Sequence, residues 1–288
     1  MDIRHFRYFI AVARQRNFTR AAEQLGIAPP TLTRQIQDME GELGARLFLR
    51  QARDVSLTEA GAALLIEAEA TVRQFESAQR NAQRAGRGDI GHIELGYVAS
   101  AVYSGLLQKQ VQGFAGEYPD VSLNVRESPM ASLSNMILEG RFDLGYIRCP
   151  LALPEGVDAV RLNDEGFVLA LPVDSWLNRL PVINSAHLQN ENFILPEQVV
   201  GTLQVAAQGH FVPKLGAQPG GLVAVIALVS LGQGVAVVPE SVVGHVSLPN
   251  VAYRQIKDCN ASSWLALIHR RFEKSPAVVR YIDRVKKG

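Results

Sequence analysis

Apolar side chains recur every three or four residues through the first 43 positions, and this spacing predicts three short amphipathic helices. The second helix is expected to begin behind Asn17, which can accept hydrogen bonds from the first free amides, and to end at Gly26. The third is expected to open at Pro30, where a missing amide hydrogen is harmless. Three sets of residues are expected to face inward: Phe6, Phe9, Ile10 and Ala13; Ala21, Ala22 and Leu25; and Leu32, Ile36, Met39 and Leu43.

The third of these helices keeps a polar face that suits contact with DNA. Thr31, Thr33, Arg34 and Gln37 are left facing outward, as on a recognition helix that lies in the major groove. Residues 45–58 then predict a short hairpin, or wing. Two helices joined by a glycine turn are common in proteins that bind no DNA, but the helix in front and the wing behind favour a winged helix-turn-helix.

The charge of this segment supports a DNA partner. Residues 1–58 contain nine arginines, no lysine and six acidic residues, a net charge of +3, whereas the whole chain carries only +1. Arginine forms bidentate contacts with phosphate and guanine and enters narrow minor grooves. The residues predicted to contact DNA are Arg20, Thr31, Thr33, Arg34, Gln37 and, at the base and tip of the wing, Arg50 and Arg53.

Residues 59–86 contain no proline and predict one long helix of roughly 40 Å. Small and apolar residues follow spacings of three and four over three heptads, which is typical of a coiled-coil seam. The helix could pack on its own domain. Pairing with a second chain is favoured, because the segment bridges two domains and because the seam residues are small enough to let two helices approach closely. Such pairing would place two recognition helices about one DNA turn apart. The seam residues are Gly61, Leu64, Ala68, Thr71, Phe75, Ala78 and Ala82.

A glycine-rich hinge at residues 87–91 separates this helix from a second half of different character. Residues 92–288 contain 16 basic and 17 acidic residues, so they present no nucleic-acid surface. Strand-like and helix-like segments alternate along them, which predicts an α/β fold with a largely parallel sheet in two lobes with a cleft between them. Strands are expected at residues 92–98, 121–125, 143–147, 167–171 and 235–238, and helices at residues 106–118, 130–139 and 222–232.

The first sixty residues resemble, without a gap, the N-terminus of LysR-type transcriptional regulators. The resemblance implies a DNA-binding winged helix-turn-helix in a bacterial regulator. Members usually show Ser-Gln-Pro where this chain has Ala28-Pro29-Pro30, which places more of the sequence readout on Thr31, Thr33 and Arg34. The resemblance is carried by residues 9–13, 18–22 and 57–61 with Leu25, Pro30, Leu32, Thr33, Arg34, Ile36, Leu43, Gly44, Leu47, Phe48, Arg50 and Arg53.

The second half resembles, more loosely, the effector domain of the same family, which is similar to a periplasmic binding protein. Residues 139–145 and 231–239 carry this resemblance. It implies that residues 92–161 and 267–288 form one lobe, that residues 162–266 form the other, and that a small-molecule effector binds between them. The domains predicted ahead of these lobes are a DNA-binding domain at residues 1–58, a linker helix at 59–86 and the hinge.

Ligands of open α/β sheets sit beyond the carboxyl ends of strands, so effector contacts are expected there. Ser100 follows the first strand, where a hydroxyl group and free helix amides suit a carboxylate, although it could equally be a plain helix cap. Met130 follows the second strand and favours a more apolar effector. Arg148 follows the third and could hold a second carboxylate, but a surface salt bridge is the favoured role. The candidate effector contacts are Ser100, Ala101, Met130, Arg148 and, in the matching turn of the second lobe, Gly201 and Thr202.

Other chemistry leaves no signal in the sequence. There is no phosphate-binding or dinucleotide-binding glycine loop, no Cys/His cluster with metal spacing and no arguable Ser/His/Asp arrangement, so we expect no cofactor, no metal and no enzymatic activity. No apolar run is long enough for a membrane span and the N-terminus resembles no secretory signal, which indicates the cytoplasm. A redox role for Cys149 and Cys259 is disfavoured because no electropositive local context is expected to activate either thiol.

Together these patterns predict a sequence-specific regulator. Its expected partners are double-stranded DNA with an interrupted inverted repeat, a small carboxylate or aromatic effector, and further copies of itself in a homodimer or homotetramer, with RNA polymerase as an additional candidate. The main alternative is a solute-binding or enzymatic domain whose N-terminal helices serve only assembly. A nucleoid-type protein that binds DNA without sequence preference is disfavoured, because a net charge of +3 on each DNA-binding domain is small for nonspecific DNA binding.

Overall fold

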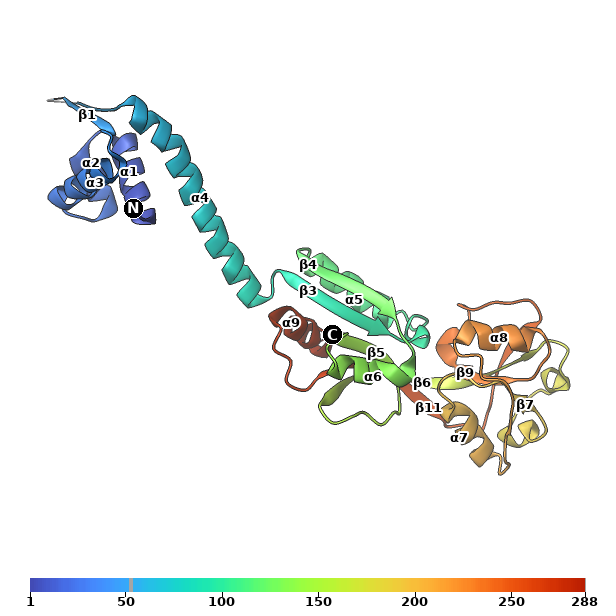
Figure 1. The fold of residues 1–288 in the computed structure, drawn as a ribbon. Coiled ribbons are helices and arrows are strands. Elements are labelled where there is room, and N and C mark those ends of the chain that lie inside the picture. Colours follow the sequence, from blue (N-terminus) through green and yellow to red (C-terminus); the bar gives the residue numbers. More distant parts are fainter. Residues whose placement is uncertain (52–53, 288) are drawn as a thin grey trace. The chain divides into compact units, whose positions relative to one another are not determined.

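The computed structural model describes residues 1–51 and 54–287 and divides into an N-terminal unit, Met1–Arg84, and a C-terminal unit, Ala85–Gly288 (Figure 1). The predicted winged helix-turn-helix is confirmed in the first unit. The tip of the wing, with Arg53, lies outside the described residues. The elements of this unit are α1 (Ile3–Gln15), α2 (Phe18–Leu25), α3 (Pro29–Leu43), β1 (Phe48–Gln51), β2 (Asp54–Leu57) and the long helix α4 (Glu59–Arg87), which runs to the start of the second unit.

Local capping explains where α2 and α3 begin and end. The Asn17 side chain accepts a hydrogen bond from the amide of Arg20 at 3.0 Å, and Gly26 closes α2 in the left-handed conformation with a φ of 65°. Helix α3 begins one residue earlier than predicted, because Pro29 and Pro30 both fit a first turn in which amides have no intrahelical partner. These few residues fix the turn between the two helices.

The inner face of α3 differs from the prediction at its end. Leu43 is 41% exposed and Glu40 is buried instead. The reason is that Glu40 Oε1 accepts hydrogen bonds from the amides of Leu47 (2.8 Å) and Phe48 (3.2 Å), which fasten the start of the wing to the helix. The buried apolar core of this unit comprises Phe9, Ala11, Val12, Ala21, Ala22, Leu32, Ile36, Met39, Leu47, Phe48 and Ala68.

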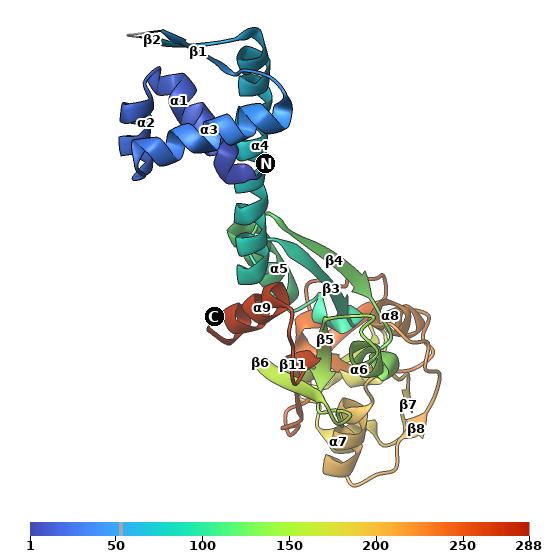
Figure 2. The same ribbon diagram turned by 60° about the vertical axis from the view of Figure 1, so that its left-hand side comes forward.

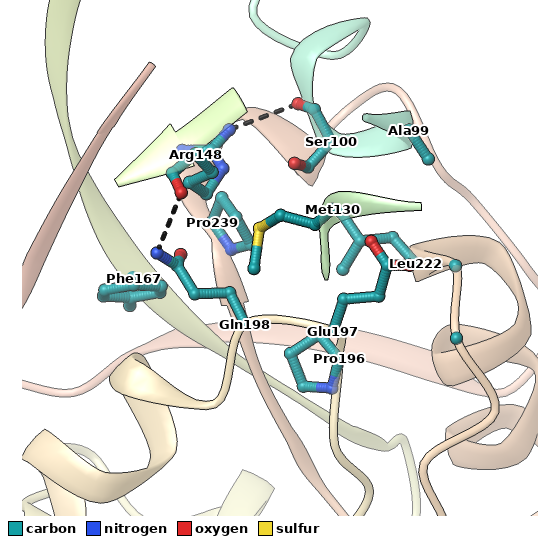
Figure 3. Close-up of a pocket in the computed structure, with 12 residues that line it drawn as sticks. Ala99, Ser100, Met130, Arg148, Phe167, Pro196, Glu197, Gln198, Leu222 and Pro239 are labelled. Atoms are coloured by element: carbon teal, nitrogen blue, oxygen red, sulfur yellow. Dashed lines mark hydrogen bonds between the residues drawn. The ribbon is translucent and has the colours of Figure 1, made fainter. Parts of the chain in front are cut away.

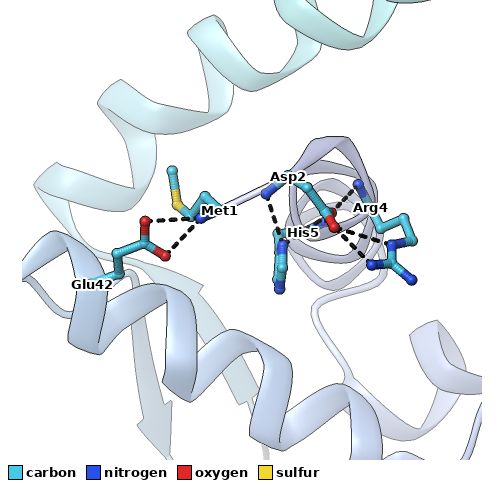
Figure 4. A network of polar contacts seen from close by, with 5 residues as sticks. All are labelled: Met1, Asp2, Arg4, His5 and Glu42. Atoms are coloured by element: carbon cyan, nitrogen blue, oxygen red, sulfur yellow. Dashed lines mark hydrogen bonds and ion pairs between the residues drawn. The ribbon is translucent and has the colours of Figure 1, made fainter.

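A polar network joins the start of α1 to the end of α3 (Figure 4). The Asp2 side chain accepts from the amide of Arg4 at 2.8 Å, and the Asp2 amide donates to His5 Nδ1 at 2.9 Å. The Arg4 guanidinium also binds this carboxylate and holds the pKa of Asp2 far below its usual range, so the helix cap stays charged at a lower pH than an ordinary aspartate would. The Met1 amino group lies 2.8 Å from both carboxylate oxygens of Glu42.

The first half of the long helix α4 packs against the core of its own unit, and Arg7 of α1 reaches further along it to Phe75 and Glu76. Gly61 and Ala68 are buried in the core and Leu64 packs against it. The Thr58 hydroxyl accepts a hydrogen bond from the amide of Gly61 at 2.9 Å and so caps the helix. The rest of the predicted seam is exposed: Thr71, Phe75, Ala78 and Ala82. Packing on its own domain therefore accounts for the first three seam residues and leaves the other four exposed, with Arg7 over the ring of Phe75.

Gly61→Ala is expected to destabilise the N-terminal unit by about 1–3 kcal/mol, although alanine favours a helix more than glycine does. A Cβ at this position would overlap the carbonyl oxygen of Leu47, which is held by a hydrogen bond from the amide of Thr58 at 3.0 Å. Gly41→Ala is the matched control, because a Cβ there meets nothing within 4 Å. Urea unfolding followed by circular dichroism compares the two, and equal stability would contradict this account.

The C-terminal unit is built on a sheet of seven strands within the described residues (Figure 2), and this sheet is mixed, not largely parallel as predicted. Its parallel part is β3 (Gly91–Tyr97), which lies between β4 (Val121–Glu127) and β5 (Leu144–Cys149). We call this part lobe one. Its helices are α5 (Leu106–Glu117), α6 (Met130–Leu138) and α9 (Pro276–Lys287), and a short 3-10 turn, η1 (Ala99–Ala101), follows β3.

The antiparallel part is formed by two strands that pass between the lobes. β6 (Val157–Pro172) carries the chain into lobe two, and β11 (Ser262–Arg270) returns it between β6 and β5. In lobe two, β6 pairs antiparallel with β9 (Ala236–Pro239) and β10 (Val251–Gln255). The other elements of lobe two are β7 (Asn192–Phe193), β8 (Lys214–Leu215), α7 (Val200–Gln208), α8 (Leu222–Ser230), η2 (Trp176–Arg179), η3 (Ser185–Leu188) and η4 (Glu240–Val242).

The lobe boundaries expected from the sequence, after residues 161 and 266, fall inside these two strands. The register of β11 against β6 shifts between Leu265 and Ala266, so an irregularity marks the crossing. Residues 265–268 belong to the core of lobe one, whereas residues 167–171 belong to the cores of lobe two. Each lobe thus has its own core, and β6 and β11 are shared.

The segment expected to be a hinge is held by contacts within the C-terminal unit. Helix α4 continues to Arg87, and Gly88 follows with a φ of 75° and packs against the backbone of Pro276. Arg280 of α9 donates a hydrogen bond to the carbonyl oxygen of Arg87 and pairs with Asp89 at 3.1 Å. These contacts fasten the start of the second unit to its last helix.

Candidate functional site

The outward face of α3 presents the residues predicted to read DNA. Thr31, Arg34 and Gln37 are exposed and three residues apart, so they share one side of the helix, and Thr33 is half-buried beside them. Arg20 is exposed on α2. In the part of the chain that the structure describes, no carboxylate pairs with Arg34 or Arg20. Their guanidinium groups are therefore available to phosphate or to a base edge.

The wing is described only in part. Arg50 lies in β1 opposite Val55 of β2, which puts its backbone on the hairpin. Arg53 lies outside the described residues, so its predicted contact with the minor groove stays a prediction. Phe48 anchors the base of the wing, since its ring packs on those of Phe9 and Phe18 at centroid distances of 5.3 and 5.7 Å.

A pocket lies between the two lobes of the C-terminal unit, with about 390 Å³ of empty space that is partly open to solvent (Figure 3). Lobe one contributes residues of η1, α6 and β5, and lobe two contributes the segments before α7 and α8 and the end of β9. The residues that line this inter-lobe pocket are Ala99, Ser100, Met130, Arg148, Phe167, Pro196, Glu197, Gln198, Gly220, Gly221, Leu222 and Pro239.

Half of the predicted effector contacts meet in this pocket. Ser100, Met130 and Arg148 come from three different elements and all line it. Ala101 is fully buried in η1 and does not line it. The rule that ligands lie beyond the carboxyl ends of strands therefore selected three residues that share one pocket, and their contact with an effector stays a prediction.

The two contacts predicted in lobe two need correction. Gly201 and Thr202 lie in the first turn of α7, not in a turn between elements, and both are buried. Neither lines the inter-lobe pocket. Gly201 packs directly against the ring of Phe167, where an added Cβ would come within 2.8 Å of the ring. Its small size lets Phe167 form the pocket wall, so its effect on a ligand is indirect.

Arg148 is buried and is not the surface residue that the favoured interpretation expected. Its side chain is 2% exposed, and Nη1 donates to Glu165 Oε2 at 2.7 Å and to Ser263 Oγ at 3.0 Å. Nη2 donates to the carbonyl oxygen of Ser100 at 3.2 Å. Glu165 also accepts from the amide of Ser241 in η4. The predicted salt bridge exists, but it lies inside the pocket wall and ties β5 to β6 and η4.

Two helices begin at the pocket without a side-chain cap. Helix α6 starts at Met130 after Pro129, and α8 starts at Leu222 after Gly221. The first amides of a helix have no partner within it, and together with the helix dipole they favour an anionic group. The arrangement therefore offers neutral donors to a carboxylate, beside a wall of mainly apolar side chains.

Sequence reasoning missed most of the lobe-two wall. Phe167 and Pro239 lie at the ends of strands that the sequence does predict, and applying the strand-end rule to lobe two could have found Pro239. The segment Pro196 to Gln198 carries no such signal. It follows β7, a strand of two residues whose partner β8 lies about twenty residues further along the chain.

The remaining chemistry of the described residues is limited. The free cysteines Cys149 and Cys259 belong to the packing of different lobes, and burial raises the pKa of both thiols, which lowers the thiolate population needed for reaction. Among residues 1–51 and 54–287, no three His, Cys, Asp or Glu side chains are grouped to hold a metal. No helix in the same ranges has the length and apolar character of a membrane span.

Comparison with known proteins covers almost the whole chain. Residues 3–62 match the family model for the bacterial regulatory helix-turn-helix protein of the lysR family, and residues 86–288 match the LysR substrate binding domain. The HTH-type transcriptional regulator YnfL of Escherichia coli strain K12 is 32% identical over 96% of this chain and 95% of its own length. BudR of Raoultella terrigena, another HTH-type transcriptional regulator, is 31% identical over 98% of this chain and 99% of its own.

Solved structures agree with this assignment. CbnR, a LysR family transcriptional regulator, matches with a TM-score of 0.83 and 25% identity over 99% of this chain and 100% of its own. Full-length BenM matches with a TM-score of 0.59 at the same identity. The chain belongs to the LysR family of transcriptional regulators, with a DNA-binding helix-turn-helix domain and an effector-binding substrate domain.

Proposed function

We propose that α3 enters the major groove of a specific operator and that Arg34 reads a base edge there. Arg34 is exposed, free of carboxylate partners among the described residues and flanked by polar side chains, as a base-reading arginine must be. The wing arginines follow into the adjacent minor groove. The full set of proposed DNA contacts is Arg20, Thr31, Thr33, Arg34, Gln37, Arg50 and Arg53.

We propose further that two copies pair through the second half of α4. Phe75, Ala78 and Ala82 are exposed there at seam spacing, and small residues allow two helices to approach closely. The two DNA-binding domains of such a pair would bind an interrupted inverted repeat, because twofold symmetry in the protein matches twofold symmetry in the operator. A homotetramer, built by further contacts between C-terminal units, is the alternative assembly.

The inter-lobe pocket is proposed to bind the effector, a small carboxylate or aromatic compound. The single observation that carries this role is that both lobes line the pocket, so a ligand can favour one arrangement of the lobes over another. A ligand with unequal affinity for two arrangements shifts their populations, which can alter how the heads engage DNA. We place the protein in the cytoplasm, acting without catalysis, with RNA polymerase as a further partner.

Arg34→Ala is expected to weaken operator binding by about 1–3 kcal/mol, or roughly 5- to 150-fold in Kd. Selection from random duplex DNA at near-physiological salt first supplies the operator, which we expect to be an interrupted inverted repeat. Titration of that operator and of a scrambled duplex then measures the loss. Arg4→Ala, which removes an equal charge from an exposed residue of α1, is the control and is expected to change affinity little.

Each outcome of this experiment bears on the proposal. An equal loss on both duplexes would reassign Arg34 to a phosphate contact. Unchanged affinity would remove it from the interface altogether. Retention of DNA without any enriched motif would overturn sequence-specific binding itself.

A further inference from the structure

We propose that the inter-lobe pocket selects ligands with a single carboxylate on an apolar body and discriminates against dicarboxylates, with Glu165 and Glu197 as the residues that set this selectivity. The inference rests on the proposed role of the pocket as the effector site. It goes beyond that role because it names the charge of the ligand and the residues that determine it.

The positive charge of Arg148 is already matched inside the wall. Its Nη1 atom donates to the Glu165 carboxylate at 2.7 Å, and the two side chains are only 2% and 8% exposed. Ser263 and the carbonyl oxygen of Ser100 take two further donor positions. Only Nε is buried without a partner. The pair therefore presents no net charge to a ligand.

The remaining features of the lobe-one end suit one anionic group. Ser100 and Met130 line the pocket there together with Arg148 (Figure 3). Met130 is the first residue of α6, a helix of nine residues whose start has no side-chain cap. Its dipole contributes about half a positive charge, which is enough to favour one carboxylate.

The lobe-two end opposes a second negative group. Phe167, Pro196, Leu222 and Pro239 give it an apolar wall, where an unpaired carboxylate is strongly disfavoured. The one acid that lines the pocket is Glu197, whose carboxylate points toward Leu222 at the start of α8 (Figure 3). No basic side chain of the described residues pairs with Glu197. A second carboxylate would thus meet apolar surface or, at the uncapped start of α8, the like charge of Glu197.

Matched acids that differ by one carboxylate test this inference on the full chain. Hexanoate against adipate and benzoate against terephthalate, titrated by calorimetry at neutral pH, are expected to differ at least tenfold in Kd in favour of the monocarboxylate. Glu165→Gln frees the charge of Arg148 and is expected to move this ratio about tenfold toward the dicarboxylate. Glu197→Gln, at an exposed residue that tolerates change, is expected to move it severalfold the same way. Glu155→Gln, exposed in lobe one and absent from the lining, is expected to leave the ratio unchanged.

A further variant separates the inference from the proposed function on which it rests. Met130→Trp should fill the pocket and abolish binding of every acid. Binding that survives Met130→Trp would show that the acids bind elsewhere, and the effector role of the pocket would fail. Binding lost in Met130→Trp, with dicarboxylates bound as tightly as monocarboxylates in the unaltered chain, would overturn the charge selectivity alone. Failure of every monocarboxylate to bind at millimolar concentration would also overturn it.

Discussion

Replacing Arg148 with methionine is expected to lower the free energy of unfolding of the C-terminal unit by about 3–5 kcal/mol. The variant removes the guanidinium but leaves the Glu165 carboxylate, whose side chain is 8% exposed, in the wall without its partner. A buried charge without a partner is far more costly than a buried pair or no charge at all. The double variant Arg148→Met/Glu165→Leu is therefore expected to be more stable than Arg148→Met alone.

Tryptophan fluorescence during urea unfolding measures this effect selectively. The two tryptophans of the chain, Trp176 and Trp264, both lie in the C-terminal unit. Arg271→Met is the control, because Arg271 pairs with Asp158 at 3.0 Å on the surface, where such pairs contribute below about 1 kcal/mol. Equal losses for the two arginine variants would contradict the importance assigned to the buried pair. So would a double variant that is less stable than Arg148→Met.

Glu40→Ala is expected to destabilise the N-terminal unit by about 2–4 kcal/mol and to weaken operator binding as well. Glu40 Oε1 accepts hydrogen bonds from the amides of Leu47 and Phe48, and its removal leaves both buried amides without that acceptor. Because these amides stand at the start of the wing, the wing loses its attachment to α3. The predicted loss therefore appears in stability and in DNA affinity together.

Two further variants on α3 make this test specific. Glu40→Gln keeps an oxygen acceptor of similar reach and is expected to recover most of the loss. Glu42→Ala removes an exposed carboxylate from the same helix, one that pairs with the Met1 amino group, and is expected to cost below about 1 kcal/mol. Circular dichroism reports on this helical unit, which contains no tryptophan. Comparable losses for Glu40→Ala and Glu42→Ala would remove the special role of Glu40.

The N-terminal unit was predictable because its signals are local. The cap at Asn17, the left-handed Gly26 and the prolines of α3 each act within a few residues, and each appears in the structure at the expected place or one residue away. Glu40 escaped prediction because its partners lie beyond the helix, in Leu47 and Phe48. A helical pattern alone assigned the inward position to Leu43, which is apolar but lies at the end of the helix.

The strand order of the sheet and the contacts in the pocket were harder to predict, because they depend on strand pairings between distant segments, which leave no local pattern in the sequence. Strand β11 pairs with residues about a hundred positions earlier, and no local pattern shows that β6 and β11 run in opposite directions. The strand-end rule found Ser100, Met130 and Arg148, because each follows a strand with a clear hydrophobic pattern. It could not show that Arg148 would face Glu165, since that contact is set by how β5, β11 and β6 align.

The central place of β11 also sets an order in which the chain can fold while it is being synthesised. Strand β5 and the core of lobe one require β11 and α9, which leave the ribosome after lobe two. The cores of lobe two draw almost entirely on residues 167–256, a continuous stretch completed earlier. Lobe two can therefore assemble on the nascent chain while lobe one still exposes an open edge of β5. Of the two lobes, it is therefore lobe one, although it is translated first, that completes its core last.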